Sequence, residues 1–423
     1  MSETTVLRHA GAWTLTVRPR LMVERVAFAG FLVLFPGFVV YHYAVAAGLL
    51  PAFLGGLFGI VSLLIAGAAV AMAGWLLGHD AWGGLPQAQS VLLALAFFLV
   101  WSLVAYLTLG SVPYAGAALV ESLGTIALWF AAFFVASFCR IEGRARRLLF
   151  GIGVAAAAGV LLAAMVEHRS LLGPLFLFGG EVDADQQVST YQGVGRSVLV
   201  AAMVLAALTH VYWRQLVVLA CATVLLTGLG SRAHLFTAAL LFVLVLAISL
   251  LRARRRGASI ALLLVAAAGV YTGWSMFLET RAGEIVDLAS STSWGMRLEV
   301  QALAVQAISD HPLLGDFGYH MREVGPGGYA HNALSAWPQF GLVGFLLYGG
   351  LIGYFAALSM VRVLSASGAS AAWRMAMMLN FAALVLAVTS EPVFSVLPAL
   401  GWGFAVNALL EEHGRRTTVR YGA

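Results

Sequence analysis

The chain of 423 residues contains no lysine, only two cysteines and few charged residues, which make up 10% of the sequence. An ordinary soluble domain has about a quarter charged residues. The absence of lysine excludes a Schiff-base lysine and the phosphate-binding lysine of a P-loop. The two cysteines, Cys139 and Cys221, are too few for a disulfide framework or a cysteine-based metal site. These absences exclude an ordinary soluble enzyme and a disulfide-rich secreted protein.

Hydrophobic residues, in contrast, make up 61% of the chain, and the mean hydropathy is +0.92. A helix that spans a bilayer needs about 20 mostly apolar residues. Twelve runs meet this requirement, so we expect an all-α polytopic membrane protein of about 12 transmembrane helices, forming a single integral membrane domain over residues 1–423. The runs lie at about 24–46, 51–77, 88–109, 114–138, 148–166, 196–212, 215–230, 232–251, 258–278, 333–361, 372–389 and 392–410.

The positions of the arginines predict the orientation of these spans. If the N-terminus is cytoplasmic, eighteen of the 24 arginines fall on cytoplasmic segments, as the positive-inside rule requires, and both termini are cytoplasmic. The first run is expected to remain as a span because no small-residue cleavage site follows it. The pI of about 9.4 therefore reflects membrane topology, and we expect no nucleic-acid partner. Two outer loops are long, at about 167–195 and 279–332.

The second outer loop contains a predicted amphipathic helix at residues 294–309. Apolar residues recur there with helical spacing on one face, which favours a helix that lies on the membrane or on the bundle. The residues of this face are Val300, Leu303, Ala304, Ala307 and Ile308.

Arginines open two of the spans whose N-termini face outward in this topology. Arg196 opens the sixth span, and Arg232 opens the eighth after the turn Gly228–Ser231, where Ser231 can cap the helix. Helix N-termini offer unpaired N–H groups and a positive dipole end, so they attract anions. Together with Arg297 in the outer loop, these residues predict an anion pocket at the depth of a lipid diphosphate. Each arginine could instead be an interfacial anchor or a salt-bridge partner.

Four further residues near the outer boundary are candidates for the site. His331 has a reference pKa suited to a general base, and Tyr329 and Asn332 lie beside it. Glu391 opens the twelfth span, either as a functional acid or as a favourable first-turn carboxylate. The outer histidines are irregularly spaced and give a weak metal signal, so we expect neither a metal nor a cofactor.

An ordered series of short motifs runs from the eighth span to the tenth. It comprises Gly-Ser-Arg at 230–232, Ser-Trp-Gly-Met-Arg at 293–297, His-Pro-Leu-Leu-Gly-Asp-Phe-Gly at 311–318, His-Asn at 331–332 and Gln-Phe-Gly-Leu-Val-Gly at 339–344. Over about residues 190–360, this series resembles the O-antigen ligase and O-antigen polymerase superfamily of bacterial envelopes. One departure is Ala233-His234 after the Gly-Ser-Arg turn, where the family often has a glycine.

The resemblance implies a metal-independent glycosyltransferase of the bacterial inner membrane that acts on the periplasmic face. Its donor is a glycan on undecaprenyl diphosphate. Its acceptor is lipid A–core in a ligase of lipopolysaccharide biosynthesis, or a second lipid-linked glycan in a polymerase. By the same resemblance, Arg232, Arg297 and less strongly Arg196 bind the diphosphate, and His331 handles the acceptor hydroxyl. A single displacement predicts inversion at the anomeric carbon. The sequence does not choose between ligase and polymerase.

A secondary transporter or a lipid-linked glycan flippase is the alternative, because twelve spans also suit a carrier. Carriers tend to place ionisable residues at the middle of the membrane. Here ionisable residues such as His42 and Glu121 lie near the ends of their runs, which favours the transferase.

Overall fold

The computed structural model describes residues 5–8, 14–17, 19–47, 49–50, 67–68, 84–110, 112–167, 191–252, 292–325, 328–366 and 368–421. The predicted span at 258–278 lies outside these residues, and the one at 51–77 has only residues 67–68 inside them. Most of the predicted outer loop at 167–195 and the first part of the loop at 279–332 also lie outside. The prediction of one domain over the whole chain therefore stays a prediction.

The described part of the chain is built almost entirely of helices. Its elements are β1 (Thr5–Arg8), β2 (Thr14–Val17), α1 (Pro19–Leu32), the π-helix η1 (Val33–Gly37), α2 (Phe38–Ala46), α4 (Pro86–Leu109), α5 (Ala115–Phe138), α6 (Arg144–Glu167), α7 (Tyr191–Leu208), α8 (Tyr212–Gly228), α9 (Arg232–Arg252), α12 (Thr292–Asp310), α13 (Tyr319–Glu323), the 3-10 helix η4 (Ala333–Ser335), α14 (Ala336–Ser365), α15 (Ala371–Thr389) and α16 (Leu397–Tyr421). The strands β1 and β2 pair antiparallel, with Thr5 opposite Val17, and this hairpin was not expected from the sequence.

Seven helices in the described part are long and apolar enough to cross a membrane. They are Leu21–Val45, Pro86–Leu109, Ala115–Phe138, Arg144–Val166, Arg232–Arg252, Ala333–Ser365 and Ala371–Thr389, and two shorter apolar helices are Gln192–Leu208 and Tyr212–Gly228. The prediction of a helical polytopic membrane protein is confirmed, whereas the number of twelve spans stays a prediction. The predicted run at 392–410 differs from the structure, because its helix begins at Leu397 and a turn occupies the residues before it.

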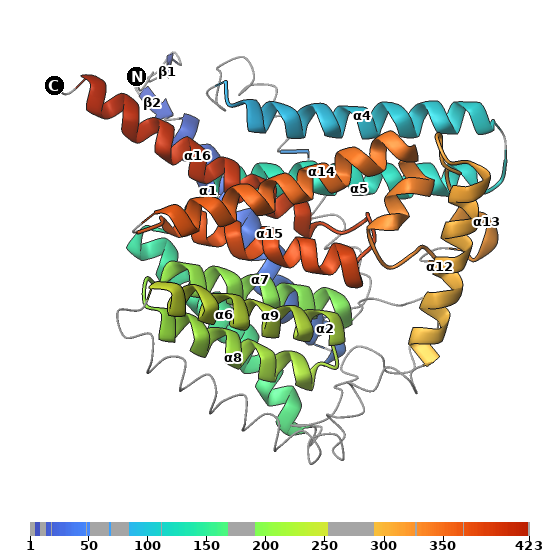
Figure 1. The fold of residues 1–423 in the computed structure, drawn as a ribbon. Helices are drawn as coiled ribbons and strands as arrows, with labels where there is room; N and C mark the ends of the chain where they lie inside the picture. Colours follow the sequence, from blue (N-terminus) through green and yellow to red (C-terminus); the bar gives the residue numbers. More distant parts are fainter. Residues whose placement is uncertain are drawn as a thin grey trace.

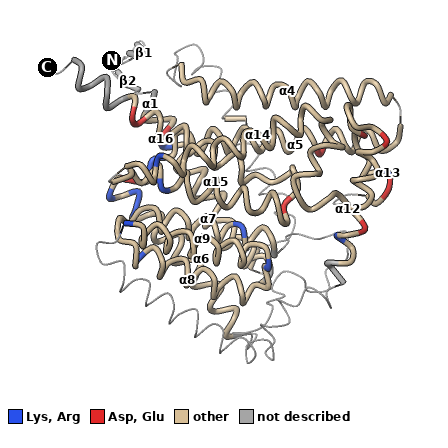
Figure 2. The backbone as a smooth tube through the Cα atoms, viewed as in Figure 1, with Lys and Arg blue, Asp and Glu red and all other residues tan. Residues whose placement is uncertain are grey.

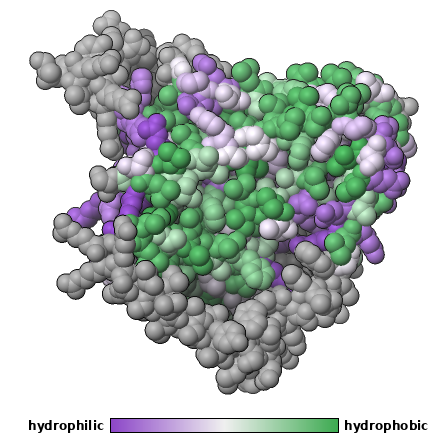
Figure 3. Space-filling model, viewed as in Figure 1, coloured by the Kyte–Doolittle hydropathy of each residue, from purple (hydrophilic) through white to green (hydrophobic). Residues whose placement is uncertain are grey.

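Most of the long helices run in roughly the same direction (Figure 1), whereas α6 and the segment from α1 to α2 cross them obliquely. Helices α4, α5, α14 and α16 form one layer, α6, α7, α8 and α9 form the other, and α15 lies between them. Helix α16 packs on both α5 and α15. Helices α12 and α13 stand across one end of the bundle instead of running along it. Hydrophobic side chains cover the flank of the bundle and hydrophilic ones gather at its two ends (Figure 3), as expected of a protein surrounded by lipid.

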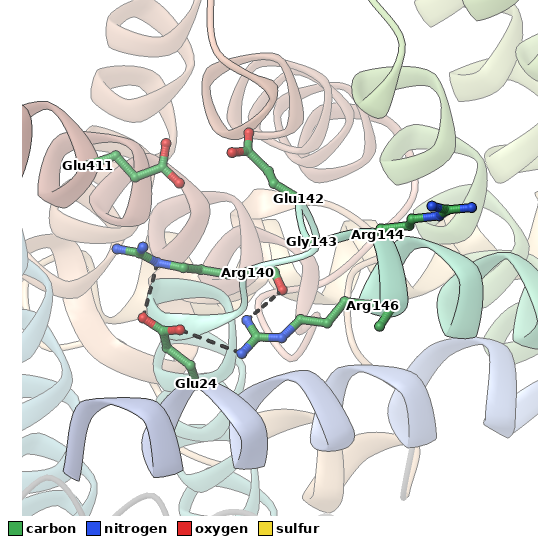
Figure 4. A pocket seen from close by; sticks show the side chains of 8 residues that line it. Glu24, Arg140, Glu142, Gly143, Arg144, Arg146 and Glu411 are labelled. Carbon is green, nitrogen blue, oxygen red and sulfur yellow. Dashed lines mark hydrogen bonds and ion pairs between the residues drawn. The ribbon is translucent and has the colours of Figure 1, made fainter. Parts of the chain in front are cut away.

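The end of the bundle opposite α12 carries many arginines, and both termini of the chain lie there (Figure 2). A hollow of about 510 Å³ at this end is lined by arginines and glutamates of α1, α6, α16 and the turn before α6. Glu24 lies between two of them, with its carboxylate 3.2 Å from Arg140 Nε and 3.6 Å from Arg146 Nη2 (Figure 4). These ion pairs tie α1 to the turn between α5 and α6 and to the first turn of α6.

Two glycines dock the segment after α12 onto the start of α14. Gly315 and Gly341 have positive φ angles of 73° and 69°, and a Cβ atom on Gly341 would lie 2.8 Å from the carbonyl oxygen of Leu313. Leu342 N donates to that same oxygen at 3.0 Å, and Asp316 N donates to the Pro338 oxygen at 2.8 Å. The motif at 311–318 therefore packs on the motif at 339–344 through backbone contacts and backbone hydrogen bonds.

We expect Gly341→Ala to lower the unfolding temperature, because a non-glycine residue in such a conformation costs about 1–3 kcal/mol and its Cβ would collide with Leu313. The measurement is thermal unfolding of the detergent-solubilised protein. Gly349→Ala on the same helix is the matched control, since a Cβ there meets open space. Equal unfolding temperatures for the two variants would contradict the docking role of Gly341.

Candidate functional site

A buried carboxylate, Glu391, lies at the centre of the candidate site. It stands in the turn between α15 and α16 and is 6% exposed. Its Oε1 accepts hydrogen bonds from Arg196 Nε at 3.1 Å and from His234 Nε2 at 3.2 Å, and its Oε2 accepts one from the Ser395 hydroxyl. His234 Nδ1 in turn lies 2.8 Å from the hydroxyl of Ser231. Both carboxylate oxygens are therefore occupied.

The neighbours of Glu391 stabilise its charged form. Burial acts to raise the pKa of this carboxyl, but the charge of Arg196, the hydrogen bond and charge of His234 and the hydrogen bond from Ser395 outweigh it. The net effect holds the pKa of Glu391 well below its usual range. We conclude that Glu391 is an ionised positioning group that fixes Arg196 and His234.

The network joins helix N-termini that are far apart in the sequence. Arg196 lies in the first turns of α7, Ser231 directly precedes α9, and Glu391 precedes α16. Helices α7 and α9 approach closely here, because a Cβ atom on Gly195 would lie 2.4 Å from the Ser231 hydroxyl oxygen. The sequence predicts Ser231 as a helix cap, and in the structure its hydroxyl contacts the ring of His234.

The start of α14 belongs to the same cluster of helix ends. Val393 N, two residues after Glu391, donates to the Ser335 hydroxyl at 2.7 Å, and that hydroxyl donates to the Asn332 carbonyl oxygen at 2.7 Å. Asn332 caps η4 by accepting from Leu334 N at 3.0 Å. Asn332 therefore has a clear structural role, and it holds the adjacent His331 beside the Glu391 turn.

Helix α12 presents Arg297 on its inward face. Arg297 has helical spacing with Ala304 and Ala307, which are buried, whereas Met296 and Leu298 on either side of it are exposed. The expected amphipathic helix is thus present, with the predicted face turned inward. These alanines pack with Tyr319 and Ala330 in a small cluster that anchors α12 to α13.

Arg297 and His331 are electrostatically coupled. Burial lowers the pKa of His331, and the positive charge of Arg297 lowers it further. Because the ordinary histidine pKa is about 6.5, the His331 ring is neutral at pH 7. A neutral ring can accept a hydrogen bond from a hydroxyl group.

Tyr329 connects His331 to a second histidine–carboxylate pair. Its ring centroid lies 5.9 Å from that of His331 and 5.6 Å from that of His320. His320 Nε2 lies 2.7 Å from Glu121 Oε2. Burial raises the pKa of Tyr329, Glu121 and Glu391 raise it further, and Arg196 lowers it. Tyr329 therefore lies within electrostatic range of both carboxylates.

The structure brings most of the predicted site residues to one end of the bundle. Arg196 and Glu391 are in direct contact, Tyr329 and His331 are stacked edge to face, and Arg297 acts on His331. Arg232 is half-buried and begins α9 directly after Ser231. Arg196 uses its Nε for Glu391, and among the described residues no partner takes its two terminal nitrogens.

Three members of this cluster, His234, His320 and Glu121, were not predicted as site residues. Glu121 carried a usable signal, because an ionisable residue inside an apolar run is unusual. His234 and His320 carried no comparable signal, since their partners lie 157 and 199 residues away in the sequence.

One comparison with known proteins gives a match. Residues 215–349 match the family model described as O-Antigen ligase, and no curated protein matches the chain. The matched region extends from α8 into α14 and includes Arg232, Arg297 and His331. Arg196, Glu121 and Glu391 lie outside it. The family expected from the ordered motifs is confirmed over residues 215–349.

Proposed function

Because residues 215–349 belong to the O-antigen ligase and polymerase superfamily, we propose that this protein is a glycosyltransferase that uses a lipid-linked donor. It moves a glycan from undecaprenyl diphosphate to an acceptor hydroxyl on the periplasmic face of the bacterial inner membrane. The acceptor is lipid A–core or a second lipid-linked glycan. The transfer needs no metal and inverts the anomeric carbon.

The observation that carries this proposal is the placement of two arginines at the closely packed starts of α7 and α9. Arg196 and Arg232 lie at the starts of α7 and α9, where helix dipoles also favour negative charge. Departure of a diphosphate creates negative charge on an oxygen, and guanidinium groups can stabilise that charge. Arg297 supplies the third guanidinium from α12.

The acceptor side of the proposed site is formed by the His331 turn. The neutral ring of His331 is suited to accept a hydrogen bond from a sugar hydroxyl and to orient it. Ser335 holds this turn in place, because its hydroxyl donates to the Asn332 carbonyl oxygen and accepts from Val393 N, two residues after Glu391. Glu391 does not react in this scheme; it keeps Arg196 in place.

The distribution of arginines supports the proposed topology. The arginine-rich end of the bundle, which holds both termini, is cytoplasmic, and the end with α12 and α13 is periplasmic. This assignment agrees with twelve spans, since an even number of crossings returns the chain to the same side.

We expect the purified protein, reconstituted in proteoliposomes with an undecaprenyl-diphosphate oligosaccharide, to form a new glycosidic bond to one of the two acceptors. Each acceptor is supplied separately, and the product is identified by mass spectrometry. The acceptor that yields product distinguishes ligase from polymerase. Movement of the labelled donor across the bilayer without bond formation would contradict the proposal and favour a flippase.

A further inference from the structure

Glu121 and His320 form a second histidine–carboxylate pair beside the proposed site. Glu121 is six residues into α5, about 9 Å along the helix axis from its start. An ionisable side chain at this depth is costly, so it is usually paired and functional. Its Oε2 accepts a hydrogen bond from His320 Nε2 at 2.7 Å, which requires the proton of the ring to be on Nε2.

His320 is held rigidly in this pairing. It is fully buried at the start of α13, and its imidazole ring contacts the rings of Tyr329 and Phe394. The start of α13 is docked on α5, because Gln339 joins Ser122 to Gly318 through hydrogen bonds of 2.7 Å and 3.4 Å. His320 Nδ1 is buried and has no hydrogen-bond partner in the described part of the chain. Among the described residues, the hydrogen bond to Glu121 is therefore the one polar contact of the His320 ring.

Glu121 is more accessible than its partner. Its side chain is 24% exposed, compared with 1% for His320. Its Oε2 is occupied by His320, and among the described residues no partner takes its Oε1. Glu121 also raises the pKa of Tyr329, after burial, while Arg196 lowers it. Glu121 and Arg196 therefore both lie within electrostatic range of Tyr329, which puts the Glu121 carboxylate in the neighbourhood of the proposed site.

The other acid–base groups of the site are less suited to remove a proton. Both oxygens of Glu391 are occupied, and its pKa is held low by Arg196 despite its burial. The pKa of His331 is lowered by burial and by Arg297, so protonation of its ring is opposed. Glu121 has a partly exposed carboxylate, and no arginine of the described residues forms an ion pair with it.

We propose that Glu121 is the general base that activates the acceptor hydroxyl, and that His320 is the residue that positions it. This inference rests on the proposed function. The hydroxyl oxygen forms a bond to the anomeric carbon while the bond from that carbon to the diphosphate oxygen breaks. The electron pair of the broken bond stays on the diphosphate, and the hydroxyl proton passes to Glu121 Oε1.

The test compares the turnover and the donor affinity of variants in the reconstituted assay. We expect Glu121→Gln to lower turnover by about 10²–10⁴-fold, the usual contribution of a general base, with unchanged affinity for the donor. His320→Ala should also lower turnover, and His320→Gln should recover part of it, because the amide can still donate to Glu121. Glu323→Gln is the matched control, since this acid of α13 is 43% exposed and pairs with Arg322.

Native-like turnover of Glu121→Gln, with Arg297→Ala impaired in the same assay, would overturn the assignment of the base and leave the proposed function intact. Absence of product from the native protein would overturn the proposed function itself. Glu121→Asp keeps the carboxylate but shortens the side chain by one methylene. It therefore tests the position of the base if Glu121→Gln does not fold. An unimpaired Glu121→Asp variant would count against a positioned base.

Discussion

The Arg297→Ala variant is expected to transfer glycan about 10²–10³-fold more slowly than the native protein, the usual loss when one donor to a developing oxyanion is removed. Arg297 is on the inward face of α12 and its charge acts on His331, so its removal changes both the leaving-group pocket and the acceptor side. Arg232→Ala should cause a comparable loss. The measurement is the rate of product formation at saturating donor and acceptor.

Arg322→Ala is the matched control for these two variants. Arg322 lies at the same end of the bundle but is engaged on the surface with Asp316 at 2.7 Å and Glu323 at 2.7 Å. It should keep near-native transfer. Retention of full activity by both Arg232→Ala and Arg297→Ala would remove the diphosphate pocket from the proposed mechanism.

The Glu391→Ala variant is expected to be less stable by about 3–5 kcal/mol, because removing one partner of a buried ion pair leaves the other charge uncompensated. The variant would leave Arg196 without its carboxylate and His234 without its Nε2 partner. Thermal unfolding in detergent measures the effect. Glu323→Ala, which removes an exposed acid, should shift the transition little.

The stabilisation by Glu391 also depends on pH in a defined direction. Its pKa is lower in the folded protein than the ordinary value of about 4.3. The stabilisation is therefore complete above that ordinary value and is lost as the pH falls toward the lower pKa of the folded state. Glu391→Gln should lose this part of the acid dependence, and an unchanged acid transition would contradict the ion-pair role.

Features with local causes could be predicted from the sequence. The apolar runs predict the described membrane helices, and the spacing of Ala304 and Ala307 predicts the inward face of α12. The expected topology puts the starts of the sixth and eighth spans on one side, and in the structure the residues that precede Arg196 and Arg232 do lie together. The hairpin at Thr5–Val17 and the late start of α16 could not, since their residues carry no strong periodicity.

Pairings across long stretches of sequence could not be predicted. Arg196 and Glu391 are 195 residues apart, and nothing local to either shows that one neutralises the other. Hydropathy identifies which faces are buried but not which polar groups meet inside them. The motif at 311–318 illustrates the same limit. In the structure, Gly315 of this motif lets the backbone pack closely against the start of α14, which no local pattern indicates.

Helix α5 links the two ends of the molecule. Glu121 lies near one end of this helix, and Arg140, bound by Glu24 of α1, directly follows the other. A rise of about 1.5 Å per residue places these two residues about 28 Å apart along the axis, close to the hydrocarbon thickness of about 30 Å. In the proposed orientation the arginine cluster lies at the inner leaflet, and the length of α5 therefore sets the depth of the Glu121 carboxylate beneath the outer leaflet. Hydrophobic mismatch in a thicker or thinner bilayer would move this carboxylate relative to the acceptor hydroxyl that it is proposed to deprotonate.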